Sequence, residues 1–418
     1  MVDPVNVGIA GLGFGAEFIP IYRDHPDARM YAICQRSEES LNSIGDAFGI
    51  ERRFTSFEDM IADLELDAVH INTPIPNHAE HSIAALRAGK HVACTVPMAM
   101  TLDECRAVAE AARASGRSYM MMETTVFSRE FLYVQEQLRN GVIGRIQFLR
   151  GAHLQEMSGW PGYWEGLPPM HYATHAIGPL LALAGALAEY VVCLGSGHIS
   201  AELTSKYGSP FAVESALVKV RDSDLSAEIT WSLFETARQY VESFSVYGDR
   251  SSFEWEQVYV RRPGAHSILL TYRCTSSVRE ARKPLRDNNH GQTASHLCQE
   301  FWSPDGGRPV LFAGADVEHL TIPDFAHVLP AEIQRYTTKG VYDDEHAHLS
   351  FKQGSGHGGS HPHLAHEFIR SIVEERKPLI DEVTAANWTS VGICAHQSAM
   401  AGGARVDLPV FRTPDKAS

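Results

Sequence analysis

The sequence predicts an α/β chain of two domains, in which a parallel sheet with helices on both faces is followed by an open, mainly antiparallel sheet. The chain has 418 residues, more than one ordinary hydrophobic core accommodates. Short β-rich runs alternate with helical patterns over residues 1–126, and such alternation is typical of a parallel sheet. Beyond that point, strand-like runs follow one another with few helical signals. We therefore expect one domain over residues 1–126 and a second, α+β domain over residues 127–418.

The first domain is expected to contain five strands joined by helices. Buried apolar runs predict strands over residues 5–10, 28–34, 68–72, 91–96 and 118–123. Helical periodicity predicts helices over residues 37–48, 56–62, 78–88 and 102–114. The last of these helices begins with a capping box, because Thr101 is followed three residues later by Glu104.

The second domain is expected to begin with a helix over residues 128–140 and a strand over residues 144–156. A turn-rich loop then runs into a helix, with His175 at the junction between them. Further strands are predicted over residues 190–196, 211–221, 226–234, 240–248 and 252–259. Residues 262–350 are predicted to form a long loop or insertion. A helix over residues 362–376, with Ser360 as its cap and Pro362 in its first turn, is expected to return towards the first domain.

Charge and cysteine content limit the classes of partner. The net charge of −15 is spread along the chain, whereas nucleic acids and anionic membranes are bound by positive patches. The longest apolar runs are too short to span a bilayer. Seven cysteines without a CxxC pair argue against a disulfide framework or a structural zinc site, and the start of the chain lacks a secretory signal. We expect a cytoplasmic protein with a small-molecule substrate, no nucleic-acid partner and no membrane partner.

The first strand ends in GIAGLGFGAEF, a stretch typical of a turn that holds a dinucleotide. Gly11 permits a tight strand–helix turn, Gly13 lets the backbone approach a pyrophosphate, and the small Ala16 allows helix–strand packing. Because the motif follows a strand and opens a helix within a β–α–β unit, it predicts a Rossmann domain. The alternative is a glycine turn without a ligand. The turn residues expected to contact the cofactor are Gly11, Gly13, Phe14 and Gly15.

The end of the second strand bears on which nicotinamide cofactor is bound. A carboxylate at this point commonly holds the ribose hydroxyls of NAD, but this chain has Gln35, Arg36 and Ser37 there. Gln35 can still hydrogen-bond a ribose, whereas Arg36 and Ser37 can accept the 2′-phosphate of NADP. NAD is the expected cofactor and NADP the alternative. A solvated arginine is the alternative to a phosphate contact at Arg36.

Three stretches of the first domain resemble the Gfo/Idh/MocA family, the group of glucose–fructose oxidoreductase and inositol dehydrogenase. They are GIAGLGFGA, INTPIPNHAEHSIAALRAGKHVACTVPMAMT and METTVFSREF. The resemblance implies a Rossmann domain followed by an α/β domain with an open sheet, and a dimer or tetramer built on that sheet. It also implies that the nicotinamide side of the cofactor cleft is lined by Thr73, Pro74, Asn77, His78, Thr95 and Pro97.

One departure from the family bears on the chemistry. The family's usual Glu-Lys-Pro triplet, whose lysine helps proton transfer at the substrate hydroxyl, is here Thr95-Val96-Pro97. A valine cannot move a proton. We therefore expect either that activity is lost or that another part of the chain supplies the acid or base.

The second domain resembles a branch of the family that also lacks this lysine. The stretch HYATHAIGP resembles a segment of the NAD-dependent α-N-acetylgalactosaminidases, and GHGGSH and DEVTAANWTSVGICAHQSAMAGGARVDLPVF resemble the same branch. The matches are partial, since Ala173 replaces a proline and His361 an aspartate, and residues 260–350 show no correspondence. They support the mechanism of the branch more than its substrate.

The resemblance implies that His175 is the catalytic acid or base. We assign a second proton-transfer role to Tyr172, and expect His171 to tune the site or to bind a substrate hydroxyl. If the helix begins early enough, His171 and His175 share one face. The alternative is that these residues only satisfy backbone groups at the start of a helix.

Aromatic side chains upstream of this segment are expected to stack on a sugar. The loop GWPGYWEG carries Trp160, Tyr163 and Trp164, and the alternative is that these rings only hold the loop together. Glu123 and His357 complete the expected substrate contacts, with His357 from the glycine-rich GHGG turn. Four histidines lie close together in GHGGSHPHLAHEF, but they match no zinc motif, and no metal is expected.

The sequence thus predicts a nicotinamide-dependent enzyme that acts on a sugar or glycoside hydroxyl. A redox-neutral glycosidase is favoured, in which transient oxidation at C3 permits elimination across C1 and C2, addition of water and re-reduction. An ordinary sugar dehydrogenase or reductase is the first alternative. A non-catalytic nucleotide-binding sensor is the second.

Overall fold

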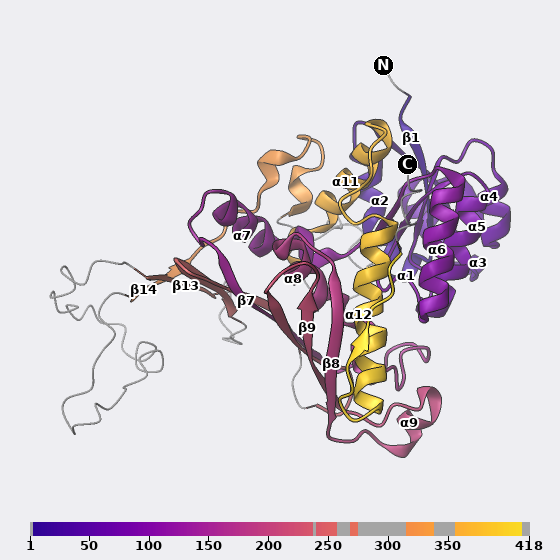
Figure 1. Cartoon of the computed structure of the whole chain (residues 1–418). Helices are drawn as coiled ribbons and strands as arrows, with labels where there is room; N and C mark the ends of the chain where they lie inside the picture. Colours follow the sequence, from indigo (N-terminus) through magenta and orange to yellow (C-terminus); the bar gives the residue numbers. More distant parts are fainter. Residues whose placement is uncertain (1–2, 237–239, 257–267, 275–314, 338–355, 412–418) are drawn as a thin grey trace, which may run out of the picture.

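The computed structural model contains two sheets, one parallel and one mainly antiparallel, which confirms the predicted fold class (Figure 1). The structure describes residues 3–236, 240–256, 268–274, 315–337 and 356–411. No helix in these ranges combines the length and the apolar character needed to cross a bilayer.

The first sheet has six strands in the order β3-β2-β1-β4-β5-β6, and every pair of neighbours is parallel. Its strands are β1 (Val5–Ala10), β2 (Ala28–Cys34), β3 (Arg52–Phe54), β4 (Ala68–Ile71), β5 (His91–Cys94) and β6 (Tyr119–Met121). Strand order changes direction at β1, which has β2 on one side and β4 on the other. In such sheets, ligands bind outside the carboxyl ends of the strands at this switch point.

Helices pack on both faces of this sheet (Figure 1). They are α1 (Leu12–Gly15), α2 (Ile19–Asp24), α3 (Glu38–Phe48), α4 (Phe57–Ala62), α5 (His78–Arg87) and α6 (Leu102–Ser115), with a 3-10 turn, η1 (Ala16–Phe18), between α1 and α2. The predicted capping box of α6 is present: the Glu104 backbone N–H donates to the Thr101 hydroxyl, and the Glu104 carboxylate accepts from the Thr101 N–H.

The second sheet has nine strands in the order β14-β13-β12-β11-β7-β10-β9-β8-β15. Only β7 and β10 pair in parallel. The strands are β7 (Ile146–Gln155), β8 (Ala188–Ser196), β9 (Val213–Val220), β10 (Ser226–Ser232), β11 (Tyr240–Gly248), β12 (Ser251–Glu256), β13 (Ile268–Cys274), β14 (Ala315–Leu320) and β15 (Val406–Asp407). Alternating burial along β9 shows that one face of this sheet is covered and the other exposed.

The covered face carries the helices that reach the first domain. The helices and 3-10 turns of this part are η3 (Thr124–Phe127), α7 (Arg129–Arg139), η4 (Pro169–Tyr172), α8 (Thr174–Ala184), α9 (Ala201–Tyr207), η6 (Ala326–Val328), η7 (Gln334–Thr337), α10 (Gly356–Gly359), α11 (His361–Val373) and α12 (Glu382–Met400). α8 lies on β7 and packs against η3, and α12 lies between β8 and α6 (Figure 1).

Several elements differ from the prediction, among them β3, β13 and β14. The three-residue strand β3 was not predicted, because so short a run has no readable period. Residues 268–274 and 315–320 were assigned to a long loop over residues 262–350, but they form β13 and β14, which pair with each other and extend the second sheet. The other described part of that range, residues 321–337, contains η6 and η7, and the remainder lies outside the described residues.

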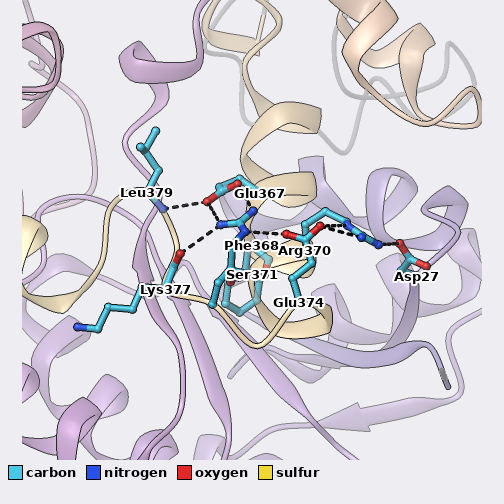
Figure 2. A network of polar contacts seen from close by, with 9 residues as sticks. Asp27, Glu367, Phe368, Arg370, Ser371, Glu374, Lys377 and Leu379 are labelled. Carbon is cyan, nitrogen blue, oxygen red and sulfur yellow. Dashed lines mark hydrogen bonds and ion pairs between the residues drawn. The ribbon is translucent and has the colours of Figure 1, made fainter. Parts of the chain in front are cut away.

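The helix predicted over residues 362–376 is present as α11, and it returns to the first domain as expected. Figure 2 shows its polar contacts: Arg370 Nη1 lies 2.8 Å from the Asp27 carboxylate, which belongs to the segment between α2 and β2. Arg376 makes two contacts of 2.7 Å with the Glu367 carboxylate, which also accepts from the backbone N–H of Leu379. These contacts fix the carboxyl end of α11 and the turn that follows it.

Candidate active site

A cavity of about 550 Å³ lies between the two domains. The first domain contributes the glycine turn and the carboxyl ends of β1, β2, β4 and β5. The second contributes Trp160, Tyr163 and Trp164 from the loop after β7, the pair Tyr172 and His175, and His357. The volume falls within the range of small-molecule and cofactor sites, about 300–1,000 Å³.

The glycine turn has the form that a bound pyrophosphate requires. Gly11 has φ +87°, and a Cβ on it would lie 2.3 Å from the carbonyl oxygen of Asn72. A Cβ on Gly13 would meet open space, because this residue borders the cavity, as does Phe14. Gly15 does not line the cavity. A Cβ there would lie 2.7 Å from Ile9 Cγ2, so this glycine serves helix–strand packing.

At the ribose end, Gln35 and Arg36 line the cavity, whereas Ser37 does not. The Ser37 hydroxyl accepts the backbone N–H of Ser40 and caps α3. Gln35 Oε1 accepts the backbone N–H of Leu12 at 3.0 Å and so ties the end of β2 to the glycine turn. Of Gln35, Arg36 and Ser37, only Arg36 both lines the cavity and has a side chain suited to a phosphate.

Five of the residues predicted for the nicotinamide side also line the cavity, as does Val96: they are Thr73, Pro74, Asn77, His78 and Thr95. Pro97 does not line it. Its carbonyl oxygen lies 2.8 Å from His78 Nδ1, and the Thr73 carbonyl lies 2.8 Å from His78 Nε2. Both ring nitrogens must donate to satisfy two carbonyl oxygens. Burial by itself lowers the pKa of His78, but the neighbouring Cys94 and these two carbonyls raise it, which favours the charged imidazole.

Glu123, His175 and Tyr172 form a continuous polar chain at the other end of the cavity. Glu123 Oε1 lies 2.6 Å from His175 Nδ1, and His175 Nε2 lies 3.3 Å from the Tyr172 hydroxyl. Glu123 is fully buried and does not line the cavity, so it acts through His175. Its carboxylate also accepts the backbone N–H of Thr125 at 3.0 Å, which fixes its position at the start of η3. This is the geometry in which a carboxylate orients an imidazole that serves a hydroxyl.

A second buried carboxylate, Glu242 on β11, lies 4.0 Å from His175 Nδ1. It accepts the hydroxyl protons of Thr125 at 2.6 Å and of Tyr240 at 2.5 Å. Burial by itself raises the pKa of Glu242, but the nearby histidines, His175 first, and the Thr125 hydroxyl lower it to about 2. Burial lowers the pKa of His175, but Glu123 and then Glu242 raise it above its ordinary value. The two carboxylates therefore favour the imidazolium form of His175.

The Tyr172 hydroxyl stays protonated in this site. Burial, followed by the charges of Glu123 and Glu242, raises the pKa of Tyr172 far above its ordinary value. A protonated phenol next to an imidazolium can donate into the cavity and recover its proton from the ring behind it.

His171 does not reach the cavity. It belongs to η4, and α8 begins only at Thr174, so the condition for a shared helical face with His175 is not met. Its ring contacts that of His396 at 5.2 Å between centroids, and His396 Nδ1 lies 2.7 Å from Glu214 Oε1. Burial lowers the pKa of His171 to about 3. The side chain thus belongs to a separate cluster under η4.

The rings of the aromatic loop contact one another and also line the cavity. The two interpretations, rings that hold the loop together and rings that contact a sugar, are therefore compatible. The ring of Trp164 is 5.7 Å from that of Trp160, 5.6 Å from that of Tyr163 and 4.6 Å from that of Tyr172. Trp164 is buried, whereas Trp160 and Tyr163 are half-buried. The loop therefore offers ring surface to a ligand next to the Tyr172 hydroxyl.

Sequence reasoning missed Glu242, which no motif marks. The available signal was a glutamate at a buried position of a strand in which apolar and polar residues otherwise alternate. The pairing of β11 with β7 then brings Glu242 beside His175. His153 on β7 lies behind the site rather than in it, with its ring stacked on Trp231 at 4.1 Å.

Residues 5–123 match the model of a family described as "Oxidoreductase family, NAD-binding Rossmann fold" and named GFO_IDH_MocA. Among curated proteins, the "Glycosyl hydrolase family 109 protein" of Shewanella baltica (strain OS155) is 26% identical over 254 residues, which cover 54% of this chain and 55% of that protein. The "Glycosyl hydrolase family 109 protein 1" of Bacteroides fragilis (strain YCH46) is 27% identical over 201 residues, 44% of this chain and 43% of that protein. The chain thus matches about half the length of these relatives or less.

Solved structures share the whole fold at low identity. A levoglucosan dehydrogenase in complex with NADH and levoglucosan has a TM-score of 0.70 at 20% identity, covering 97% of this chain and 100% of that one. An aldose-aldose oxidoreductase from Caulobacter crescentus has a TM-score of 0.66 at 16% identity, with 97% and 100% covered. The family description agrees with the nicotinamide cofactor that the sequence predicts. Residues 5–123 are therefore similar to the NAD-binding Rossmann domain that the GFO_IDH_MocA model describes.

Proposed function

We propose that this chain is a nicotinamide-dependent enzyme that hydrolyses a glycoside without net oxidation. The observation that carries the proposal is the position of the proton-transfer groups. Val96 lines the wall where the family resemblance calls for a lysine, and Tyr172 and His175 line the opposite side of the same cavity. The relatives named glycosyl hydrolase family 109 proteins support the same function.

The cavity suits a nicotinamide nucleotide. The open space at Gly13, the close approach at Gly11 and the lining by Gln35 and Arg36 favour a pyrophosphate and ribose along the first domain. NAD is the proposed cofactor, and Arg36 keeps NADP as the alternative. When bound, the cofactor supplies a reversible hydride acceptor for a sugar carbinol.

In the proposed reaction, C3 of the bound glycoside would give up its hydride to the cofactor and its hydroxyl proton to solvent, and the resulting ketone would acidify the proton on C2. Loss of that proton and of the aglycone would form a double bond between C1 and C2. Water would then add at C1, C2 would regain a proton, and the same hydride with a proton from solvent would restore the hydroxyl at C3. The net reaction is hydrolysis of the glycoside by water, without net oxidation. It therefore needs proton donors and acceptors that work near neutral pH.

Tyr172 and His175 supply the proton donor. The Tyr172 hydroxyl donates to the departing oxygen and takes the proton of His175 Nε2, 3.3 Å away. Glu123 holds the opposite ring nitrogen and stabilises the imidazolium that precedes this transfer. Because His175 reprotonates Tyr172 as it donates, Tyr172 does not become a free phenolate inside the buried site.

The aromatic loop supplies the sugar contact. Trp160 and Tyr163 expose ring surface beside Trp164, and the apolar face of a pyranose stacks on such surfaces. We propose a sugar or glycoside as the substrate on this ground.

We also propose that the chain acts in the cytoplasm as a homo-oligomer. Five cysteines, Cys34, Cys94, Cys105, Cys193 and Cys394, are free and buried, as suits a reducing compartment. Leu194 on β8 and Leu217 on β9 are more than half exposed on the uncovered face of the second sheet, which supports that face as the contact between subunits. Sedimentation of the wild type and of Leu217→Glu tests the assembly, and an unchanged mass would rule out this face.

The activity is tested with a panel of 4-nitrophenyl α- and β-glycosides that begins with the N-acetyl-α-galactosaminide, in D₂O with added NAD. Release of 4-nitrophenol, deuterium at C2 by NMR and no net reduced nicotinamide are expected. Net growth of the reduced-nicotinamide absorbance without nitrophenol would make the chain a sugar dehydrogenase. Cofactor binding without turnover of any glycoside would favour the non-catalytic sensor.

Two variants test the residue assignments in the same assay. Tyr172→Phe and His175→Gln are each expected to lower nitrophenol release by about 100-fold or more, the usual effect of losing a general acid. His171→Gln serves as the matched control, because His171 lies outside the cavity. A folded Tyr172→Phe protein with full activity would remove Tyr172 from the mechanism.

A further inference from the structure

The ribose end of the cavity contains a carboxylate that the end of β2 lacks. Strand β2 is followed by Gln35, Arg36 and Ser37, none of which is acidic. The lining at this end also includes residues 55–58, which follow β3. The last of them, Glu58, is the one acidic side chain among the described residues that line the cavity. It belongs to a part of the chain that the glycine-turn motif does not mark.

The pairing of β2 with β3 brings Glu58 to this position. Cys34 and Phe54, the last residues of the two strands, lie opposite each other, and the Gln35 backbone N–H donates to the Phe54 carbonyl at 3.1 Å. The segment after β3 therefore runs along the same wall as Gln35. Burial, followed by the charges of Glu58 and Asp59, raises the pKa of the Cys34 thiol to about 12, which agrees with a carboxylate close to the end of β2.

The Glu58 carboxylate is charged and held in place. Its Oε2 accepts the Ser56 hydroxyl proton at 3.0 Å, and the same hydroxyl accepts the Asp59 backbone N–H and caps α4. The backbone N–H of Glu58 and then the Ser56 hydroxyl lower the pKa of Glu58, so the group is ionised at neutral pH. Within the described ranges no side chain donates to its other oxygen, Oε1, which leaves that atom to a ligand.

The residues after β2 do not offer the same chemistry. The adenosine ribose of NAD has two hydroxyls, and a carboxylate can accept from both of them. Gln35 Oε1 already accepts the Leu12 N–H, so its amide has only the donor group left for a ligand. Arg36 only donates, and Ser37 caps α3. The acceptor for the diol therefore comes from Glu58.

Arg36 and Glu58 favour different cofactors. Both line the ribose end of the cavity, and both are exposed. The guanidinium attracts a 2′-phosphate, whereas the carboxylate repels it. Glu58 is already tied to the cap of α4, while Arg36 has to give up the rotamer freedom of an exposed side chain to hold a phosphate. The fixed carboxylate therefore outweighs the mobile guanidinium, and the balance favours NAD.

We propose that Glu58 selects NAD over NADP, by accepting the two hydroxyls of the adenosine ribose and by repelling a 2′-phosphate. This inference deepens the proposed function and rests only on its nicotinamide cofactor. A carboxylate from the first turn of α4 thus takes the part of the one that NAD-binding domains commonly carry at the end of the second strand.

The first test measures binding by titration calorimetry with NAD and with NADP. The wild type is expected to bind NAD more tightly than NADP by about tenfold or more. Glu58→Gln keeps the size of the side chain but removes its charge. It should weaken NAD binding by about tenfold, the value of one charge-assisted hydrogen bond, and strengthen NADP binding. A wild-type preference that persists unchanged in Glu58→Gln would overturn the inference.

Asp59→Asn is the matched control for this variant. It removes the same charge one residue further along α4, and Asp59 does not line the cavity. The ratio of the NAD and NADP affinities should therefore stay within about twofold of that of the wild type. An equal change of that ratio in both variants would assign the preference to the general charge of α4 and overturn the contact with the ribose.

The second test probes the contact itself with the NAD analogue whose adenosine lacks the 2′-hydroxyl. The wild type should bind this analogue about tenfold more weakly than NAD, because Glu58 loses a donor. Glu58→Gln should bind the two nucleotides within about threefold of each other, since groups in contact are not additive. Equal penalties in the wild type and in the variant would show that Glu58 does not reach the hydroxyl, and would overturn the inference.

Both tests read binding rather than turnover, so they separate this inference from the glycosidase. A wild type that binds neither NAD nor NADP would overturn the cofactor of the proposed function and this inference together. A wild type that prefers NAD through Glu58 but releases no aglycone from any glycoside would support this inference and count against the glycosidase.

Discussion

At position 96 an isopropyl side chain lines the cavity, where the family resemblance calls for a lysine. In the same cavity, Nδ1 of His175 faces two buried carboxylates, Glu123 at 2.6 Å and Glu242 at 4.0 Å. The proposed role of His175 as an acid therefore depends on Glu123 and Glu242 as well as on the imidazole itself.

Glu123→Gln tests that dependence. The variant keeps a side chain of the same size but removes the charge that raises the pKa of His175. A group that must be protonated to act loses activity as the pH rises through its pKa. The alkaline limb of the kcat profile should therefore move to lower pH, and kcat at pH 7.5 should fall by about tenfold or more.

The control for Glu123→Gln is Glu156→Gln, because Glu156 accepts from Ser158 outside the cavity. Its pH profile should match that of the wild type. If Glu123→Gln lowers kcat with an unshifted alkaline limb, the carboxylate only orients the ring and does not set its charge.

Arg36 carries a prediction about cofactor choice. Its side chain lines the ribose end of the cavity, whereas Ser37 is engaged in capping α3. Arg36→Ala should weaken NADP binding by about tenfold, the value of one charge-assisted hydrogen bond, and leave NAD binding within about twofold. Titration calorimetry with each cofactor measures both. Equal loss for the two cofactors would show that Arg36 supports the adenosine in general.

At the scale of elements, the parts of the fold that have a clear period were predictable. β1 and β2 fall on the predicted residues, because each is an apolar run bounded by turn residues. α12 was not predicted as a helix. It is buried around most of its circumference between β8 and α6, so its sequence lacks the polar stripe that marks a surface helix.

The amino end of α6 gives the prediction at this scale. Its capping box satisfies the first backbone N–H groups of a 14-residue helix. Thr101→Ala removes the acceptor for the Glu104 N–H and should lower the free energy of unfolding by about 1 kcal/mol. Urea denaturation measures the change. Thr101→Ser keeps the hydroxyl and should stay within about 0.5 kcal/mol of the wild type, and an equal loss in both variants would assign the effect to the lost methyl group.

At the scale of the whole molecule, the candidate site is assembled from segments far apart in the chain. Tyr172 and His175 could be predicted because they lie in one short motif. Their partners could not, since Glu123 precedes them in the first domain's last connection and Glu242 follows on another strand of the sheet. Glu17 and His361 meet only because α11 returns to the first domain. Such contacts between domains leave no local pattern in the sequence.

The same burial makes the folded protein sensitive to mild acid. Several buried or half-buried histidines have a pKa well below the ordinary value of 6.5, because burial penalises the charged ring. Those with a pKa of about 4 are His25, His91 and His363, and those with a pKa of about 3 are His70, His153 and His171. In the unfolded chain each regains a pKa near 6.5.

The sign of the effect follows from proton counts. Between pH 6.5 and about 4, the unfolded chain binds protons that the folded protein does not, so the free energy of unfolding falls as the pH is lowered. Each group contributes at most about 1.4 kcal/mol per pH unit in that window. His78 and His175 act in the opposite direction, since their raised pKa values stabilise the fold below pH 6.5 and lose that contribution as the pH rises. More histidines have a lowered pKa than a raised one, so on balance the folded protein loses stability as the pH is lowered.

We therefore expect the melting temperature to fall steadily from pH 7 to pH 5, above the ordinary pKa of carboxyl groups. Glu130, whose pKa is raised by burial to about 7, opposes this trend but is outnumbered by the histidines with lowered pKa values. Scanning calorimetry at constant ionic strength measures it. His91 allows a single-site check, because its Nδ1 accepts the Ser118 N–H at 3.1 Å and its Nε2 lies 3.3 Å from Arg117, which leaves no acceptor for a second ring proton. His91→Asn keeps an acceptor and removes the titrating group, so the drop between pH 7 and pH 5 should be smaller in this variant. A melting temperature that stays constant over this interval in the wild type would mean that these rings are protonated in the folded protein or that water reaches them.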